Sequence, residues 1–247
     1  VTSEITFYEV AKDLNVRQYY MLKSDAVMSG VVSDVTSDND WQFLCEQNVP
    51  TGTTAETPFR IQGTIPHPFL WDTEHPHLYL LKTQLWQGEQ LLDEAEVTFG
   101  IRDAVFKKDG FYLNGKKLRI RGLNRHQSYH YFLERCDELG LLVFTEFPGW
   151  QHIGDDTWKA QAVVNAEDMI RQYRNHPSII LWGVRINESP DDDPFYEKTN
   201  AVAHKLDPTR PTGGVRAIKK SHLLEDVYTY NDFLHDGETP GCDPKKK

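Results

Sequence analysis

Two continuous apolar runs constrain the fold of this chain more than any other feature: LLVFTEF at 141–147 and SIILWGVRI at 178–186. Apolar runs without polar alternation are typical of strands buried on both faces, which occur in parallel sheets covered by helices. Two further candidate strands are LRIRGLN at 118–124 and VYTY at 227–230, and TGGVRAI at 212–218 is a poorer candidate because of its glycines.

Helical patterns separate these strands. Apolar residues recur at helical spacing over 156–174, and a second helix is expected over 191–206 with Ser189 as its N-cap. A third, shorter helix is expected over 130–139, ended by a glycine. Strands that alternate with helices predict an α/β domain built on a parallel sheet.

The first hundred residues follow a different pattern. Short alternating segments such as EITFYEV, FRIQGTI and HLYLLKTQLW are broken by turn residues, and helical periodicity is scarce. This pattern is typical of an antiparallel β-sandwich of the size of an immunoglobulin-like domain. The chain is therefore predicted to be multidomain, with a β part followed by an α/β part.

Composition excludes some classes of partner. A formal net charge of −10 argues against nucleic acid, whose phosphates bind clusters of Lys and Arg. No apolar run approaches the length of about 18 residues that would indicate a membrane span, so we expect a soluble protein. The sequence opens without Met, which leaves cytoplasmic, periplasmic and secreted locations open. Association into a homo-oligomer also stays open.

Polar side chains gather at the ends of the predicted parallel strands. Because these ends meet at one mouth in such folds, chemistry is expected there. The residues concerned are His126, Glu146, Asn187, Glu188, Tyr230 and Asn231. Two carboxylates on neighbouring strands, Glu146 and Glu188, suit glycoside chemistry, which uses one acid with a raised pKa and a second carboxylate as nucleophile or base.

Each of these residues also has a structural interpretation. Glu188 directly precedes a predicted helix and could favour the helix dipole. Glu146 could pair with an arginine, and His126 could be a hydrogen-bonded structural histidine. A metal site formed by His126, Glu146 and His152 is a weaker hypothesis, because no HExxH or comparable spacing supports it. No metal site is predicted.

Three ordered segments carry a specific resemblance. FGIRDAVFKKDGFYLNGKKLRIRGLNRHQ, FLERCDELGLLVFTEFPGWQHIG and RNHPSIILWGVRINES strongly resemble glycoside hydrolase family 2, over about residues 65–247. The resemblance implies an immunoglobulin-like β-sandwich over 1–103 and a partial TIM (β/α) barrel over 104–247. The β-galactosidase branch is the nearest, on WGVRINESPDDDPFYEKTNAVAHKLDPTRPTGGVR.

The resemblance also implies a reaction: retaining hydrolysis of a terminal β-linked sugar by two glutamates, without a cofactor. Glu188 matches the acid/base of the family, and Asn187 matches the asparagine that binds the sugar 2-hydroxyl. The resemblance further implies a set of substrate-binding residues: His126 at the sugar site, Glu146 and Trp150 on the rim, and Tyr230 near the nucleophile. Asn231, at the same strand end as Tyr230, is also predicted to bind the substrate.

Departures from the family pattern are equally informative. The nucleophile belongs near a seventh barrel strand, and the sequence stops after the sixth, so no nucleophile is predicted in this chain. A helix and a strand expected before FLERCDELG are replaced by the short junction HQSYHYF, which makes the chain about thirty residues shorter there. A sugar-binding jelly roll that normally precedes the sandwich has no counterpart. Trp150 stands where some members have a metal-ligating Glu, so that magnesium site is not expected.

These departures predict an incomplete part of a retaining exo-β-glycosidase, of the β-galactosidase type. Two alternatives stay open. One is a β-glucuronidase, which would need a basic or amide pocket for the sugar carboxylate. The other is a non-catalytic module that binds sugars or protein partners.

Overall fold

The computed structural model describes residues 2–5, 13–23, 40–50, 53, 59–126, 129–217 and 220–231 of the chain. The chain divides into two compact units. The sandwich unit comprises Val1–Trp71 and His77–Ile101, and the α/β unit comprises Asp72–Pro76 and Arg102–Lys247.

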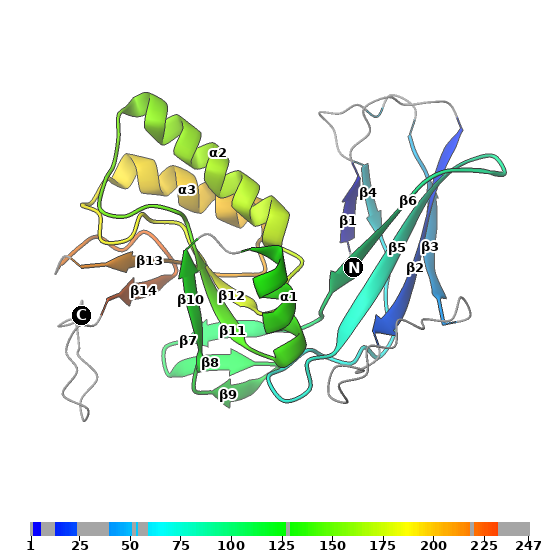
Figure 1. Ribbon diagram of the computed structural model, residues 1–247, viewed down its shortest axis with the longest axis horizontal. Coiled ribbons are helices and arrows are strands. Elements are labelled where there is room, and N and C mark those ends of the chain that lie inside the picture. The colour runs from blue at the N-terminus through cyan, green and yellow to red at the C-terminus, as the bar shows by residue number, and fades with distance from the viewer. Residues whose placement is uncertain are drawn as a thin grey trace. The chain divides into compact units, whose positions relative to one another are not determined.

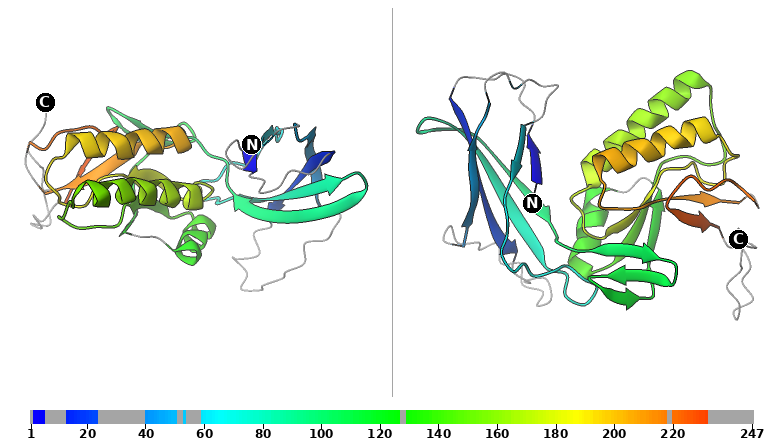
Figure 2. Two further views of the ribbon diagram at one scale, coloured as in Figure 1. Left: turned by 90° about the horizontal axis from the view of Figure 1, so that it is seen from above. Right: turned by 180° about the vertical axis from the view of Figure 1, so that it is seen from behind.

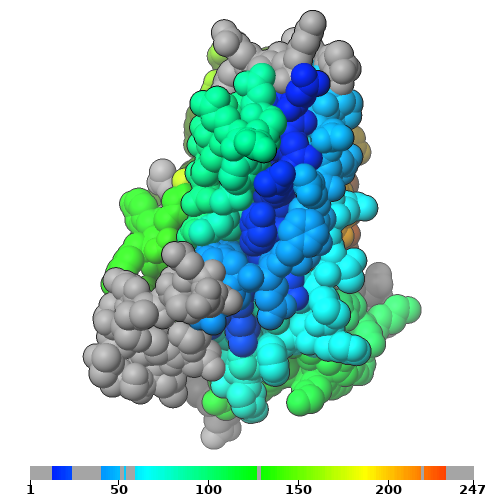
Figure 3. Space-filling view, turned by 90° about the vertical axis from the view of Figure 1, so that its right-hand side faces the viewer, coloured from blue at the N-terminus to red at the C-terminus, as the bar shows by residue number. Residues whose placement is uncertain are grey.

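The sandwich unit contains two antiparallel sheets. Four strands pair in the order β3-β2-β5-β6, and two more form the pair β1-β4; Figure 3 looks onto the four-stranded sheet, with β2 between β3 and the β5–β6 pair. Their bounds are β1 Thr2–Ile5, β2 Leu14–Lys23, β3 Gln42–Asn48, β4 Phe59–Gln62, β5 Leu78–Gln87 and β6 Gln90–Phe99. Leu14 and Val16 of β2 pack against Phe59 and Ile61 of β4, so a core forms between the two sheets. The predicted β-sandwich is confirmed.

The predicted parallel sheet is confirmed in the α/β unit, where five parallel strands pair in chain order. They are β10 Gly122–His126, β11 Leu142–Glu146, β12 Ile179–Gly183, β13 Thr212–Arg216 and β14 Val227–Tyr230. The helices between them are α1 His130–Leu139, α2 Asp156–Tyr173 and α3 Asp193–Leu206. Helices α2 and α3 lie side by side against the sheet (Figures 1 and 2).

A hydrophobic core lies between the helices and the sheet. Its buried members come from all three helices, from β11 and β12, and from Val184 directly after β12: Leu133, Cys136, Val143, Met169, Ile170, Tyr173, Ile179, Trp182, Val184 and Ala203. Each large side chain among them contributes about 1.5–3 kcal/mol by leaving water. This core explains the apolar runs of the sequence, because β12 is buried along its whole length.

Strand β12 ends at Gly183, where the close approach of Glu146 on β11 leaves no room for a side chain. A Cβ on Gly183 would lie 2.8 Å from both Cα and Cγ of Glu146 on β11. Contacts that short are repulsive, so only glycine fits beside the Glu146 side chain. Gly183 therefore fixes where the carboxyl at the end of β11 can lie.

Two arginines, Arg102 and Arg210, bind backbone carbonyls at the amino-terminal end of β12. Arg102 donates to the carbonyls of Pro177 and Ile179, and Arg210 donates to Ile179 O at 2.7 Å and pairs with Asp207. Burial and, after it, the neighbouring Arg210 lower the pKa of Arg102 to about 9. These hydrogen bonds satisfy backbone carbonyls that would otherwise be buried without partners.

Two local expectations were wrong. The single strand expected over 118–124 is divided, because β9 (Lys116–Leu118) belongs to a separate antiparallel sheet with β7 (Ala104–Lys107) and β8 (Gly110–Leu113). Turns at Asp109 and Asn114-Gly115 fold these strands into tight hairpins before β10 begins.

The start of α3 also differs from the expectation. Asp192 caps this helix by accepting from the backbone N–H of Phe195 at 3.2 Å, and the helix begins at Asp193. The Ser189 hydroxyl instead bonds to Ile186 O at 2.8 Å. The prediction that Ser189 is the N-cap of α3 was therefore wrong, because its hydroxyl bonds to the loop that precedes the helix.

Among the described residues, no helix is long and apolar enough to cross a membrane.

We expect Gly183→Ala to destabilise the α/β unit by about 1–3 kcal/mol, the usual cost of overpacking a core. Ser178→Ala is a matched control in the same buried region. The Ser178 hydroxyl has no hydrogen-bond partner in the described part of the chain, so its removal should change stability by less than about 1 kcal/mol. Urea unfolding of both variants measures the difference, and equal midpoints would contradict the packing argument.

Candidate active site

The loops that follow the parallel strands are joined by backbone hydrogen bonds. Gln151 N–H, after β11, donates to Asn187 O at 2.8 Å, and Glu188 N–H, after β12, donates to Val215 O at 3.0 Å. Trp150 and Asn187 also form a parallel bridge. The carboxyl ends of β11, β12 and β13 therefore form one continuous polar edge.

Glu188 lies at the centre of this edge, and three side chains bind its carboxylate. Oε2 accepts from Trp150 Nε1 at 3.0 Å and from Gln151 Nε2 at 3.2 Å, while Oε1 accepts from Asn231 Nδ2 at 2.7 Å. The hydrogen bonds from Trp150 and Asn231 hold the pKa of Glu188 below its ordinary value. In this arrangement Glu188 is a carboxylate.

The backbone of Glu188 is in the left-handed region, with φ of 58°. This conformation is uncommon for a residue with a side chain and persists where the surroundings impose it. Here the backbone bond to Val215 and the three side-chain bonds impose it. Strain of this kind concentrates at functional sites.

One amide bridges both members of the Asn-Glu pair. Asn231 Nδ2 lies 3.2 Å from Asn187 Oδ1 as well as 2.7 Å from Glu188 Oε1. Trp150 keeps 65% of its surface exposed although its Nε1 is bonded, so its ring faces solvent beside the carboxylate. An exposed indole next to a carboxylate suits the stacking and hydrogen bonding of a sugar ring.

A second polar pair lies at the ends of β10 and β11. His126 and Glu146 are register partners, with His126 Nε2 at 3.7 Å from Glu146 Oε1. Glu146 is fully buried, and burial raises its pKa, an effect that the nearby His126 opposes. The sequence predicted Glu146 on the rim, whereas the structure places it beneath the surface.

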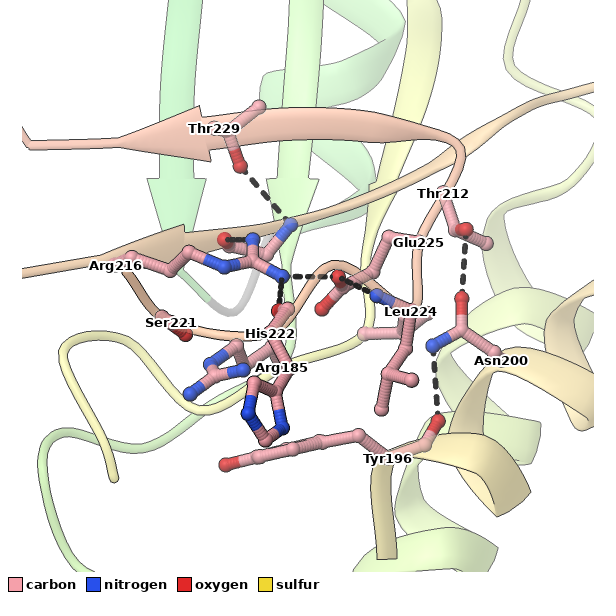
Figure 4. A network of polar contacts seen from close by, with 12 residues as sticks. Arg185, Tyr196, Asn200, Thr212, Arg216, Ser221, His222, Leu224, Glu225 and Thr229 are labelled. Atoms are coloured by element: carbon pink, nitrogen blue, oxygen red, sulfur yellow. Dashed lines mark hydrogen bonds and ion pairs between the residues drawn. The ribbon is translucent and has the colours of Figure 1, made fainter. Parts of the chain in front are cut away.

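Buried polar contacts lie behind the site. In Figure 4, Arg216 pairs with Glu225 and donates to the carbonyl of His222 at 2.8 Å, and Arg185 lies beside this network. Arg185 is fully buried, and its Nη2 donates to Ser189 O at 3.2 Å and to Asp191 Oδ1 at 2.7 Å. Its guanidinium also lies 4.7 Å from the centre of the Tyr196 ring. Arg185 thus fixes the chain on the far side of Glu188.

Asp191 extends this network to the loop between β13 and β14. It accepts from the Ser221 hydroxyl and from His222 N–H at 3.0 Å. Burial alone would raise the pKa of Asp191, but the bonds from Ser221 and Arg185 outweigh burial and hold it at about 2. The two loops therefore share one ionised carboxylate.

Sequence reasoning found some of these residues and missed others. The structure brings together Glu188, Asn187, Trp150 and Asn231, and it sets His126 beside Glu146 as a separate pair. Tyr230 lies at the end of β14, with its ring 6.2 Å from that of Tyr228. Gln151 and Arg185 were missed. The sequence signal for Gln151 was its position directly after Trp150. The signal for Arg185 was a charged residue inside an apolar run.

The metal hypothesis gains no support from the described residues. None of their His, Cys, Asp and Glu side chains form a group of three or more that could hold a metal ion. His126 and Glu146 adjoin, but the His152 ring packs against Trp158 at 5.9 Å.

Comparison with known protein families gives two matches, in the order expected. The model described as "Glycosyl hydrolases family 2" matches residues 10–102, and "Glycosyl hydrolases family 2, TIM barrel domain" matches residues 128–236. A β-galactosidase of Thermoanaerobacterium thermosulfurigenes is 52% identical over 204 residues, which cover 68% of this chain and 28% of that protein. A β-galactosidase of Thermoanaerobacter pseudethanolicus is 46% identical over 70% of this chain and 28% of its own length.

Solved structures agree with these matches. A β-glucuronidase of Parabacteroides merdae superposes with a TM-score of 0.65 and 26% identity, over 90% of this chain and 31% of that one. The chain thus spans about 28% of the length of the β-galactosidases it matches. The fold class is confirmed: an immunoglobulin-like sandwich followed by part of a TIM barrel, with no closed barrel among the described residues.

We expect Trp150→Phe to raise the pKa of Glu188 towards the ordinary value of 4.5, because it removes the hydrogen bond that lowers this pKa most. Trp158→Phe is the control, since Trp158 packs against Phe195 and makes no bond to Glu188 in the described structure. Carboxyl-carbon NMR titration of Glu188 in each variant measures the effect. An unchanged pKa in Trp150→Phe would contradict the assignment of the shift.

Proposed function

The chain belongs to the glycosyl hydrolases of family 2, and on that premise we propose that the protein of which it forms part is a retaining exo-β-glycosidase of the β-galactosidase type. The 52% identity to a β-galactosidase supports the sugar preference. The observation that carries the proposal is the Glu188 carboxylate, held by Trp150, Gln151 and Asn231 at the joined strand ends. The substrate is a carbohydrate with a terminal β-linked sugar.

Glu188 is proposed as the acid and base of the reaction. As a carboxylic acid it protonates the glycosidic oxygen while a second glutamate attacks the anomeric carbon. The C–O bond to the leaving group breaks, and a glycosyl-enzyme ester forms. Glu188, now a carboxylate, then takes a proton from the water that hydrolyses the ester. The reaction needs no cofactor.

The lowered pKa of Glu188 bears on this role, because an acid must hold a proton near neutral pH. The three hydrogen bonds favour the carboxylate form, and among the residues that the structure describes no carboxylate shifts this pKa. A second carboxylate brought close to Glu188 would raise its pKa by charge repulsion. We propose that the nucleophilic glutamate, supplied by another part of the longer protein, also provides this effect.

The remaining residues at the mouth are proposed to bind the sugar. Asn187 and Asn231 present amides beside Glu188, and Trp150 offers its exposed ring as a stacking surface. His126 and Tyr230 are proposed as further sugar contacts from the flanking strands. In this proposal residues 104–247 form the catalytic domain and 1–103 the sandwich that precedes it.

A β-glucuronidase is the second candidate, supported by the likeness to the Parabacteroides merdae enzyme. The two sugars differ at C5, which carries a hydroxymethyl group in galactosides and a carboxylate in glucuronides, and in the configuration of the C4 hydroxyl. We expect the complete protein to hydrolyse nitrophenyl β-galactoside faster than nitrophenyl β-glucuronide. The reverse order would favour the second candidate, and binding of either sugar without hydrolysis would favour a non-catalytic module.

We expect Glu188→Gln in the complete protein to slow hydrolysis of galactosides with poor leaving groups by about 100-fold or more, the usual contribution of general acid catalysis. Galactosides with good leaving groups should be slowed less, because such groups depart without a proton. The control is Glu197→Gln, an exposed glutamate of α3. Steady-state rates over a series of aryl galactosides test this, and equal slowing across the series would contradict the acid role.

A further inference from the structure

His126 and Glu146 are neighbours because β10 pairs in parallel with β11 and sets the two residues opposite each other in the register. His126 Nε2 lies 3.7 Å from Glu146 Oε1, within ion-pair distance.

The two partners differ in exposure. The Glu146 side chain is 1% exposed, whereas that of His126 is 44% exposed. Neither oxygen of Glu146 has a hydrogen-bond partner in the described part of the chain. A buried carboxyl without partners is costly, so its presence calls for a compensating group.

Two side chains of β10 favour the carboxylate form of Glu146: His126 through its charge when protonated, and then the neutral amide of Asn124. Strand β12 faces Glu146 with Gly183, which has no side chain. Burial acts in the other direction and favours the protonated carboxyl.

We propose that Glu146 is a positioning residue for His126: its carboxylate pairs with the imidazole and fixes that ring at the mouth of the sheet. The role towards the sugar rests on the proposed function. The pairing itself rests only on the register, the 3.7 Å separation and the burial of Glu146. When Glu146 takes up a proton, the charge that holds the ring is lost.

The pairing is tested on the 247-residue chain by following the Glu146 carboxyl carbon through a pH titration, with resonances assigned by triple-resonance NMR. We expect the Glu146 midpoint to lie above the ordinary value of 4.5 and to rise by about 1 unit in His126→Asn, the shift expected when a nearby opposite charge is removed. His126 is exposed, so this variant leaves the core intact. Glu167→Gln, at a surface pair with Arg171, is the control and should leave the midpoint unchanged.

A Glu146 midpoint that does not move in His126→Asn, or that lies at the ordinary value, would overturn the pairing. This experiment requires no enzymatic activity. Its result therefore stands whether or not the proposed function is correct.

The role in substrate binding is tested in the complete protein with nitrophenyl β-galactoside. We expect Glu146→Gln, which keeps the shape of the side chain, to raise KM about tenfold with little change in kcat, because a misplaced His126 weakens ground-state and transition-state binding alike. The double variant with His126→Asn should lose no more than His126→Asn alone, since Glu146 acts through His126.

Additive losses in the double variant, or a fall in kcat at unchanged KM, would overturn the positioning role. A wild-type protein without activity towards β-galactosides would overturn the proposed function and, with it, the role towards the sugar. The NMR titration would then still decide the pairing.

Discussion

Burial of β12 on both faces is the constraint on which the α/β unit depends. All five residues from Ile179 to Gly183 are buried, so this strand needs a neighbour on each edge and helices across it. Strands β11 and β13 supply the edges, and α2 and α3 contribute to the core that covers it. The apolar run that contains β12 ends at Ile186. The polar pair Asn187-Glu188 follows directly and therefore lies at the edge formed by the carboxyl ends of β11, β12 and β13.

The conformation of this edge also depends on the charged side chains behind it. Arg185 and Asp191 hold the loop that contains Glu188 and connect it to the loop leading into β14. Strand β14 in turn delivers Asn231, whose amide binds Glu188. A buried ion pair adds little net stability because desolvation opposes its attraction. Its contribution here is to geometry: it helps to hold Glu188, whose backbone is in the left-handed region, beside the three side chains that donate hydrogen bonds to it.

Much of this could be predicted from the sequence, for physical reasons. The apolar runs determine β11 and β12 because continuous burial permits few folds, and motif resemblance placed Asn187 and Glu188. The start of α3 was missed because Ser189 and Asp192 are both good caps, and the choice depends on which backbone groups the surrounding loop leaves unpaired. Gln151 was missed because its role comes from a loop conformation with φ of 59°, which no spacing reveals.

The two carboxyl groups at this edge of the sheet, those of Glu146 and Glu188, have pKa values shifted in opposite directions. Burial raises the pKa of Glu146, and hydrogen bonds lower that of Glu188. In glycosidases the carboxyl that acts as the acid has a raised pKa. Here the pKa of Glu188, the proposed acid, is lowered, and the raised pKa belongs to Glu146. Glu188 is half-buried, and a second carboxylate brought close to it would raise its pKa. Under the proposed function, the α/β unit positions the carboxyl that carries the catalytic proton, and the proposed nucleophile supplies the negative charge that keeps this proton on Glu188.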